Sequence, residues 1–218
     1  MTEKQHRIYM LFCMAGRTEE ALEYKAKCEK EASPGSSPDA AEDRRRDNEP
    51  QAGQSVSRAD IHYLVGDATA PQVVGQKIIV HVCNDIGAWG CGFVMALSRR
   101  WAIPERRYRA WYHTGKGFGL GAVQFVPVEL NIVIANMIAQ RGLAMCSQAE
   151  PPIRYEALEQ CLRQVAERAV ETNASVHMPR IGCGLAGGDW AEVEPIIRRS
   201  LTDAGVPVYV YDLPPASH

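Results

Sequence analysis

Two glycine-rich segments constrain this chain more than any other feature, because each follows a β-rich stretch and precedes a helical one. The first, residues 86–92, has the sequence IGAWGCG and follows KIIVHVC. The second, residues 181–188, has the sequence IGCGLAGG and follows ASVHMP. Glycine tolerates positive φ and leaves backbone N–H groups uncovered, and the first turn of a helix leaves further N–H groups unpaired. The pattern therefore predicts two strand-to-helix turns, each able to hold a phosphate group.

A single Gly-x-Gly turn is equally well explained as a tight connection with no ligand. Two matching turns in one small domain favour phosphate binding. Ligands of open parallel sheets bind beyond the carboxyl ends of the strands, where both turns would lie, so the two could grip a diphosphate from opposite sides. Neither turn continues into the Gly-Lys-Ser/Thr of a triphosphate-binding loop, and neither fits the GxGxxG of nicotinamide dinucleotide binding.

Strand and helix signals alternate between residues 58 and 214, which we interpret as the folded domain. Strands are expected at residues 61–66, 77–83, 122–128, 131–138, 174–179 and 206–213, with helices at 93–101, 104–111, 155–169 and 191–201. Pro127 is expected to mark the end of the third strand. An apolar stripe at helical spacing supports the third helix, and its members are Tyr155, Leu158, Leu162, Val165, Ala166 and Ala169. Alternation of this kind predicts an α/β fold with a mainly parallel sheet between helices.

The first 57 residues differ in composition from this domain. Residues 33–57 are rich in Pro, Gly, Ser, Asp, Glu and Arg without apolar periodicity, which predicts a flexible linker. Residues 1–32 are expected to form a helical segment of unknown role, with Thr18 as the N-cap of its helix.

Composition excludes several classes of function. A net charge of -2 argues against a dedicated nucleic-acid binder, and no apolar run is long enough to cross a bilayer. The seven cysteines include no CxxC pair and no zinc-finger spacing, which is typical of reduced thiols inside a cell. We therefore expect a cytoplasmic monomer without metal, cofactor, membrane contact or sequence-specific nucleic-acid binding.

Three stretches resemble the signatures of the macrodomain family. They are VGDAT at residues 65–69, HVCNDIGAWGCGF at 81–93 and MPRIGCGLAGGDW at 178–190. The resemblance covers residues 60–213 and is greatest to the branch with terminal ADP-ribose-glutamate hydrolases, fungal ADP-ribose-1''-phosphate phosphatases and a chromatin-remodeller macrodomain. It implies a three-layer α/β/α fold with a mixed, mostly parallel central sheet. The implied partner is ADP-ribose or an ADP-ribosylated macromolecule.

The resemblance also implies which residues bind the ligand. Asp67, beside Ala68, matches the carboxylate that accepts a hydrogen bond from the adenine amino group. Asn84 matches a residue near the distal ribose. The other matched residues belong to the two turns: Ile86, Trp89, Gly90, Cys91, Gly92 and Phe93 in the first, and Arg180, Ile181, Gly182, Cys183, Gly184 and Leu185 in the second. Trp89 is expected either to stack on the ligand or to pack inside its own loop.

Catalytic candidates are fewer, because the hydrolases of this branch carry an aspartate after GCGL where this chain has Ala186. This difference argues against the mechanism of those hydrolases, in which a carboxylate assists a lysine nucleophile. Lys116 is the lysine near the corresponding stretch, although a solvated loop residue is the simpler interpretation. Asp189, three residues beyond Ala186, either reaches the site or caps the next helix. His81 matches a histidine of the fungal phosphatases and is either a general acid or base or a core residue.

Cysteines between glycines are a further candidate, since a thiolate at a helix N-terminus is reactive. Cys91 and Cys183 have no histidine paired with them in the sequence, which favours simple loop packing.

Two hypotheses follow. In the first, the protein binds ADP-ribose and hydrolyses an ADP-ribosyl linkage or an ADP-ribose derivative, using the two turns for positioning and electrostatic stabilisation. In the second, it is a reader of ADP-ribosylated protein or nucleic acid without chemistry. Ala186 favours the reader, whereas His81 and the two intact turns favour the enzyme.

Overall fold

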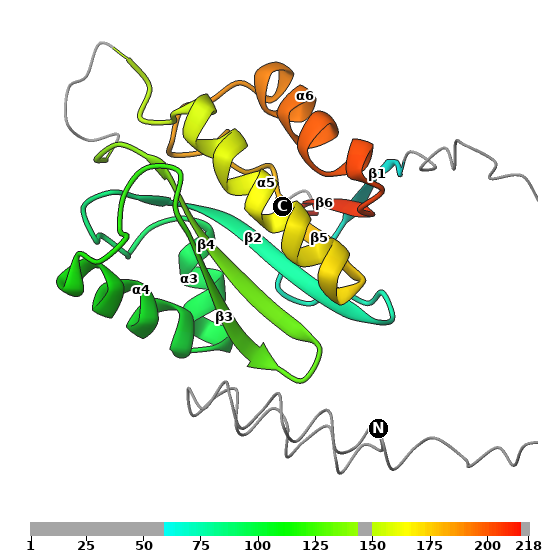
Figure 1. The fold of residues 1–218 in the computed structure, drawn as a ribbon, viewed down its shortest axis with the longest axis horizontal. Helices are drawn as coiled ribbons and strands as arrows, with labels where there is room; N and C mark the ends of the chain where they lie inside the picture. The colour runs from blue at the N-terminus through cyan, green and yellow to red at the C-terminus, as the bar shows by residue number, and fades with distance from the viewer. Residues whose placement is uncertain (1–58, 144–149, 215–218) are drawn as a thin grey trace, which may run out of the picture. The chain divides into compact units, whose positions relative to one another are not determined.

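The computed structural model describes residues 59–143 and 150–214, so the predicted helix after Thr18 and the predicted linker lie outside the described residues. The described residues form one six-stranded sheet with helices packed against it (Figure 1). The strands are β1 (Ile61–Val65), β2 (Gln76–Asn84), β3 (Val123–Glu129), β4 (Ile132–Gln140), β5 (Ala174–Pro179) and β6 (Val208–Asp212). The helices are α3 (Phe93–Arg100), α4 (Ile103–Thr114), α5 (Tyr155–Thr172) and α6 (Trp190–Ser200), followed by the short 3-10 helix η1 (Thr202–Ala204).

The sheet is mixed and mostly parallel, in the order β1-β6-β5-β2-β4-β3. Within the sheet of the described residues, β3 and β4 pair in the antiparallel direction and all other neighbouring strands pair in parallel. Figure 1 shows α5 and α6 on one side of the sheet and α3 and α4 on the other. The predicted three-layer α/β/α architecture is therefore confirmed. Because β2 and β5 are parallel neighbours, their carboxyl ends meet at one edge, and the two glycine turns begin there.

The core has two halves, one on each face of the sheet. Alternate side chains of β2 enter opposite halves, since successive residues of a strand point to opposite faces. Ile78 and Val80 pack on the side of α5 and α6, whereas Ile79 and Cys83 pack on the side of α3 and α4. This two-sided burial explains why the stretch has the continuous apolar sequence of a central parallel strand.

The apolar stripe predicted for the third helix is found on α5. Tyr155, at the start of the helix, is half-buried. The other five members of the stripe are buried against the sheet: Leu158, Leu162, Val165, Ala166 and Ala169. In the described part of the chain, every helix is too short or too polar to cross a membrane.

The prediction that Pro127 ends its strand is wrong. β3 continues to Glu129, with a shift in its pairing with β4 between Pro127 and Glu129. Proline removes a backbone donor, which a central strand cannot spare. β3 is the last strand of the sheet, however, and an edge strand tolerates proline because one of its sides forms no ladder.

A core substitution on α5 tests this packing. Leu162 is completely buried, so Leu162→Ala should lower the free energy of unfolding by about 2–5 kcal/mol through lost burial and the cavity left behind. Val170 on the same helix is 59% exposed, and Val170→Ala should change that free energy by no more than about 0.5 kcal/mol. Urea unfolding of both variants measures the difference. Equal effects would contradict the burial of this face.

Candidate functional site

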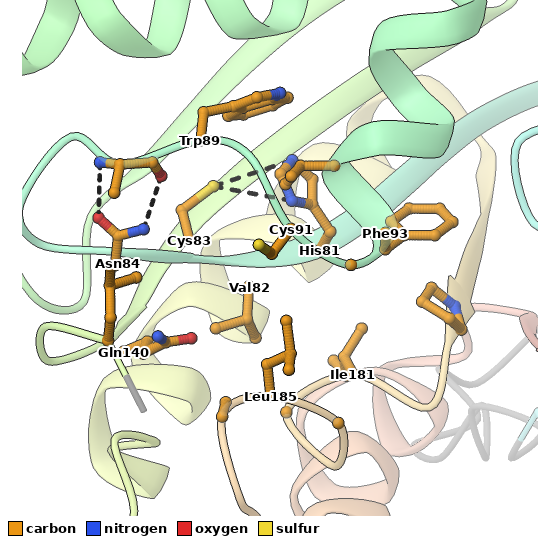
Figure 2. A pocket seen from close by; sticks show the side chains of 18 of the residues that line it. His81, Val82, Cys83, Asn84, Trp89, Cys91, Phe93, Gln140, Ile181 and Leu185 are labelled. Carbon is orange, nitrogen blue, oxygen red and sulfur yellow. Dashed lines mark hydrogen bonds between the residues drawn. The ribbon is translucent and has the colours of Figure 1, made fainter. Parts of the chain in front are cut away.

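A cavity of about 510 Å³ lies between the two glycine turns, at the carboxyl ends of β2 and β5 (Figure 2). Figure 2 shows Ile181 and Leu185 of the second turn on the opposite side of the cavity from Cys91 and Phe93 of the first. Twelve residues singled out in the sequence line it: His81, Asn84, Trp89, Gly90, Cys91, Gly92, Phe93, Arg180, Ile181, Gly182, Gly184 and Leu185. The fold therefore brings together two segments about 90 residues apart in the chain.

Six other predicted residues do not line this cavity: Asp67, Ala68, Ile86, Lys116, Cys183 and Asp189. Asp67 lies just beyond the carboxyl end of β1, at the same edge of the sheet, and its carboxylate accepts hydrogen bonds from the backbone and hydroxyl of Thr69, both at 2.8 Å. Ala68 is buried beside it, and Ile86 is exposed within the first turn.

Asn84 organises the first turn. Its Oδ1 atom accepts hydrogen bonds from the backbone N–H groups of Ile86 (3.2 Å) and Ala88 (2.9 Å). Its Nδ2 atom donates to the carbonyl of Ala88 at 2.6 Å, as Figure 2 shows. The hydroxyl of Tyr108 donates to the backbone carbonyl of Asn84 at 2.7 Å. The Asn84 amide is thus engaged in shaping the turn that surrounds it.

The first turn ends at a helix that no side chain caps. Gly92 is the N-cap of α3, with φ of 76°, a left-handed conformation that favours glycine. No side chain of the cap accepts a hydrogen bond from the first turn of α3, and Gly92, Phe93 and Val94 all line the cavity. The unpaired N–H groups and positive dipole end of α3 therefore favour an anion in the cavity.

The second turn is held by its own backbone. The N–H of Gly188 donates to the carbonyl of Gly182 at 2.8 Å, and that of Gly187 donates to Gly184 at 3.0 Å. A Cβ atom added at Gly188 would lie 2.7 Å from the Gly182 carbonyl oxygen, so only glycine fits there. At Gly184, by contrast, an added Cβ would meet nothing within 4 Å. Gly184 is exposed and lines the cavity, and no neighbouring atom of the described residues covers it there.

His81 is a core residue beneath the cavity. Its side chain is 2% exposed, and its Nε2 atom donates to Oδ1 of Asn136 at 2.7 Å. Burial lowers the pKa of His81 to about 4, against the opposing effect of the Asn136 hydrogen bond. The imidazole is consequently neutral near pH 7 and a weak base, which favours the interpretation of His81 as a core residue. His177, similarly buried, lies between Ser175 and Tyr211 and does not line the cavity.

Asp189 and Lys116 have structural positions away from the cavity. The carboxylate of Asp189 accepts a hydrogen bond from the backbone N–H of Ala191 at 2.9 Å, so Asp189 is the N-cap of α6. Lys116 is exposed in the turn that follows α4, and its carbonyl accepts a hydrogen bond from the indole of Trp111 at 3.0 Å. Asp189 is therefore a helix cap and Lys116 a solvated loop residue, the simpler of the two interpretations considered for each.

The cysteines of the turns differ in exposure. Cys91 is exposed in the first turn and lines the cavity. Cys183 is half-buried, donates its thiol to the carbonyl of Ile181 at 3.4 Å, and has its pKa raised by burial. A raised pKa favours the protonated thiol, so Cys183 is not an activated nucleophile.

Arg180 supplies the positive charge at the cavity. Of the described residues that line it, Arg180 alone carries a permanent charge, and none is a carboxylate. Its guanidinium forms a two-pronged ion pair with Asp212 at 2.7 and 2.9 Å. The same group lies over the rings of Tyr63 and Trp190, 5.4 and 5.0 Å from their centroids. These contacts hold Arg180 in one place at the rim.

Eight lining residues were not predicted from the sequence: Val82, Cys83, Ala88, Val94, Gln140, Leu143, Pro179 and Ala186. Most are direct neighbours of predicted residues. Gln140 and Leu143 are different, because they belong to the end of β4 and its following loop, which reach the cavity through the pairing of β4 with β2. The buried, parallel character of both strands was the available signal. Within residues 59–143 and 150–214, no group of three or more His, Cys, Asp or Glu side chains could hold a metal ion.

Comparison with known proteins gives a consistent result. A family model described as Macro domain matches residues 133–197. The solved structure of a macrodomain protein from Streptomyces coelicolor is 56% identical, with a TM-score of 0.63, over 70% of this chain and 99% of that chain.

Two curated relatives are more distant. Mouse chromodomain-helicase-DNA-binding protein 1-like is 32% identical over 174 residues, which are 75% of this chain but 19% of that protein, so the match spans about a fifth of its length. An ADP-ribose 1''-phosphate phosphatase of Lodderomyces elongisporus is 26% identical over 160 residues, 70% of this chain and 99% of the phosphatase.

The burial of His81 leads to a pH-dependent stability. A histidine of the unfolded chain titrates near pH 6.5, whereas the pKa of folded His81 is about 4, so the folded state binds fewer protons between these values. The contribution of His81 to the free energy of unfolding is therefore complete above about pH 6.5 and declines as the pH falls towards 4, by roughly 2–3 kcal/mol. An NMR titration of the His81 imidazole measures its midpoint directly. A midpoint near 6.5 would contradict the buried position.

Proposed function

This chain belongs to the macrodomain family, and we propose that it binds ADP-ribose in the cavity between its two glycine turns. The volume of the cavity, about 510 Å³, is within the range of roughly 300–1,000 Å³ typical of small-molecule sites. The observation that carries the proposal is the convergence of two turns of exposed backbone on that one cavity. Backbone N–H groups can hold a diphosphate without a cluster of basic side chains, which suits a protein with a net charge of -2.

The two ends of the cavity suggest how the ligand is oriented. Arg180 follows β5 at one end of the cavity and pairs with Asp212 at the end of β6. β1, the neighbour of β6 in the sheet, is followed by Asp67. Asn84 and Gln140, the last residues of β2 and β4, lie at the other end. We place the diphosphate between the turns, the adenine towards Asp67 and the distal ribose towards Asn84 and Gln140. The Asn84 amide already forms hydrogen bonds with the backbone of the turn, so a contact with the ribose would have to use the same Oδ1 or Nδ2 atom.

The cavity supports binding better than acid–base catalysis. Its described lining contains no carboxylate, the His81 imidazole is buried and neutral, and Ala186 occupies the position where the hydrolases carry aspartate. On this basis the function best supported is recognition of ADP-ribose, free or attached to protein or nucleic acid.

Hydrolysis is the second candidate, and one observation favours it. The Lodderomyces elongisporus protein, named an ADP-ribose 1''-phosphate phosphatase, matches this chain over 99% of its own length. With these lining residues, the attacking group would be a water oriented by a phosphate of the ligand, and the N–H groups of the turns would stabilise the developing charge.

Substitution of Gly184 tests the binding site. In Gly184→Glu the new side chain enters open space without backbone strain, so the fold is kept, and a carboxylate on a residue that lines the cavity should repel a diphosphate. We expect ADP-ribose binding, measured by titration calorimetry, to weaken by at least about 10-fold, which corresponds to about 1.4 kcal/mol. Gly119→Glu is the matched control, because an added Cβ there also meets nothing within 4 Å and Gly119 does not line the cavity. Wild-type affinity in Gly184→Glu would overturn the proposed site.

Release of ADP-ribose from an ADP-ribosylated protein tests the second candidate. We expect release to persist in His81→Gln, since an imidazole whose pKa is lowered to about 4 by burial is a weak base, and to be lost in Gly184→Glu, which places a carboxylate at the cavity. Loss of release in His81→Gln with intact ADP-ribose binding would identify His81 as a catalytic residue. If the wild-type protein binds ADP-ribose, releases none from the modified protein and frees no phosphate from ADP-ribose 1''-phosphate, recognition is the function supported.

A further inference from the structure

We propose that a closed circuit of hydrogen bonds through four residues positions the first glycine turn for its ligand. The members of this four-residue circuit are Trp89, Ser98, Glu105 and Arg109. The indole Nε1 of Trp89 donates to Ser98 Oγ at 2.8 Å, and Ser98 Oγ donates to Glu105 Oε2 at 2.9 Å. Nε of Arg109 donates to Glu105 Oε1 at 3.0 Å. Nη2 of Arg109 then donates to the backbone carbonyl of Trp89 at 3.0 Å, which closes the circuit.

The circuit joins the first turn to both helices that follow it. Ser98 lies in α3, whereas Glu105 and Arg109 lie four residues apart on α4 and so project from the same face. Arg109 also approaches the carbonyl of Gly87, with Nη1 at 3.5 Å. The turn is therefore fixed to a framework of two helices as well as to the end of β2.

The position of the circuit relative to the ligand-facing residues is what gives it a role in binding. Gly90, Cys91 and Gly92 are exposed and line the cavity. Trp89 comes immediately before this segment, and Ser98 belongs to the helix immediately after it. The hydrogen bond between Trp89 and Ser98 thus ties together the two sides of the segment. Glycine has much conformational freedom to lose, so a turn that is ordered before the ligand arrives costs less to occupy.

The chemistry of each member suits this role. The Trp89 side chain is 8% exposed, and a buried indole N–H requires an acceptor, which Ser98 supplies. A carboxylate can accept at both oxygens, so Glu105 serves Ser98 and Arg109 together. The guanidinium fork of Arg109 reaches two acceptors at once, the Glu105 carboxylate and the Trp89 carbonyl, which a lysine ammonium matches poorly.

The circuit contributes to positioning more than to global stability. The side chains of Arg109 and Glu105 are 44% and 31% exposed, and exposed ion pairs add little to the free energy of unfolding. An exposed ion pair elsewhere, Arg168 with Glu171, lies three residues apart on α5 and contacts neither turn. This pair is a control, because it joins two charged side chains of one helix without a connection to the cavity.

Ser98→Ala and Glu105→Ala each break the circuit, and two measurements on the full chain test the result. Without ligand, the ¹⁵N order parameters of Gly90, Cys91 and Gly92 should fall, and exchange of the Trp89 indole proton should become faster. The Kd for ADP-ribose, measured by calorimetry, should rise by about 3- to 10-fold, the effect of one or two lost hydrogen bonds. Ser98→Thr keeps the hydroxyl and should restore both properties, and Glu171→Ala should leave both unchanged.

The inference about binding affinity rests on the proposed function, and the two can fail separately. If the wild-type protein does not bind ADP-ribose, the proposed function fails, while the ligand-free order parameters still test the circuit. If the wild-type protein binds and both variants bind equally tightly with unchanged order parameters, the circuit is overturned alone. A loss of affinity matched by an equal loss in the free energy of unfolding would also overturn it, because the circuit would then be merely structural.

Discussion

Exposed backbone is the constraint on which this structure depends. A phosphate can approach peptide N–H groups only where no side chain stands in the way, and glycine is the residue that permits this. The parallel pairing of β2 with β5 places two such stretches at one edge of the sheet. The first runs into α3, which no side chain caps, whereas α6 after the second is capped by Asp189. In the proposed mode of binding, the dipole of α3 would act on the diphosphate from the first turn, and the second turn would contribute its own amides.

Backbone without side chains is difficult to hold in place, and the neighbouring residues compensate for this. In the first turn, the Asn84 amide binds the backbone of Ile86 and Ala88, and the four-residue circuit fastens Trp89 to α3 and α4. In the second, the backbone bond from Gly188 to Gly182 closes the turn so tightly that a Cβ has no room. Both turns are thus ordered by hydrogen bonds among protein groups, while Gly90, Gly92 and Gly184 remain exposed at the cavity.

The described side chains around the cavity offer no strong acid, base or nucleophile whose activation the structure shows. Burial keeps His81 neutral and Cys183 protonated, and the described lining holds no carboxylate. The one permanent charge, on Arg180, is already paired with Asp212 and packed against Tyr63 and Trp190. Such a site is well suited to recognising a diphosphate, and any hydrolysis there would have to draw on the ligand and on water.

The sequence by itself determined the alternation of strands and helices, the apolar stripe of α5 and the two glycine turns, because these depend on local periodicity and on the freedom of single residues. It also indicated eighteen site residues, of which twelve, from two distant segments, line one cavity. Tertiary structure decided the rest. Pro127 remains within β3 because that strand is at the edge of the sheet, Gln140 reaches the cavity through strand pairing, and His81 is a weak base because of its burial. Pairing, edge position and desolvation arise only when distant parts of the chain meet, so local sequence carries little trace of them.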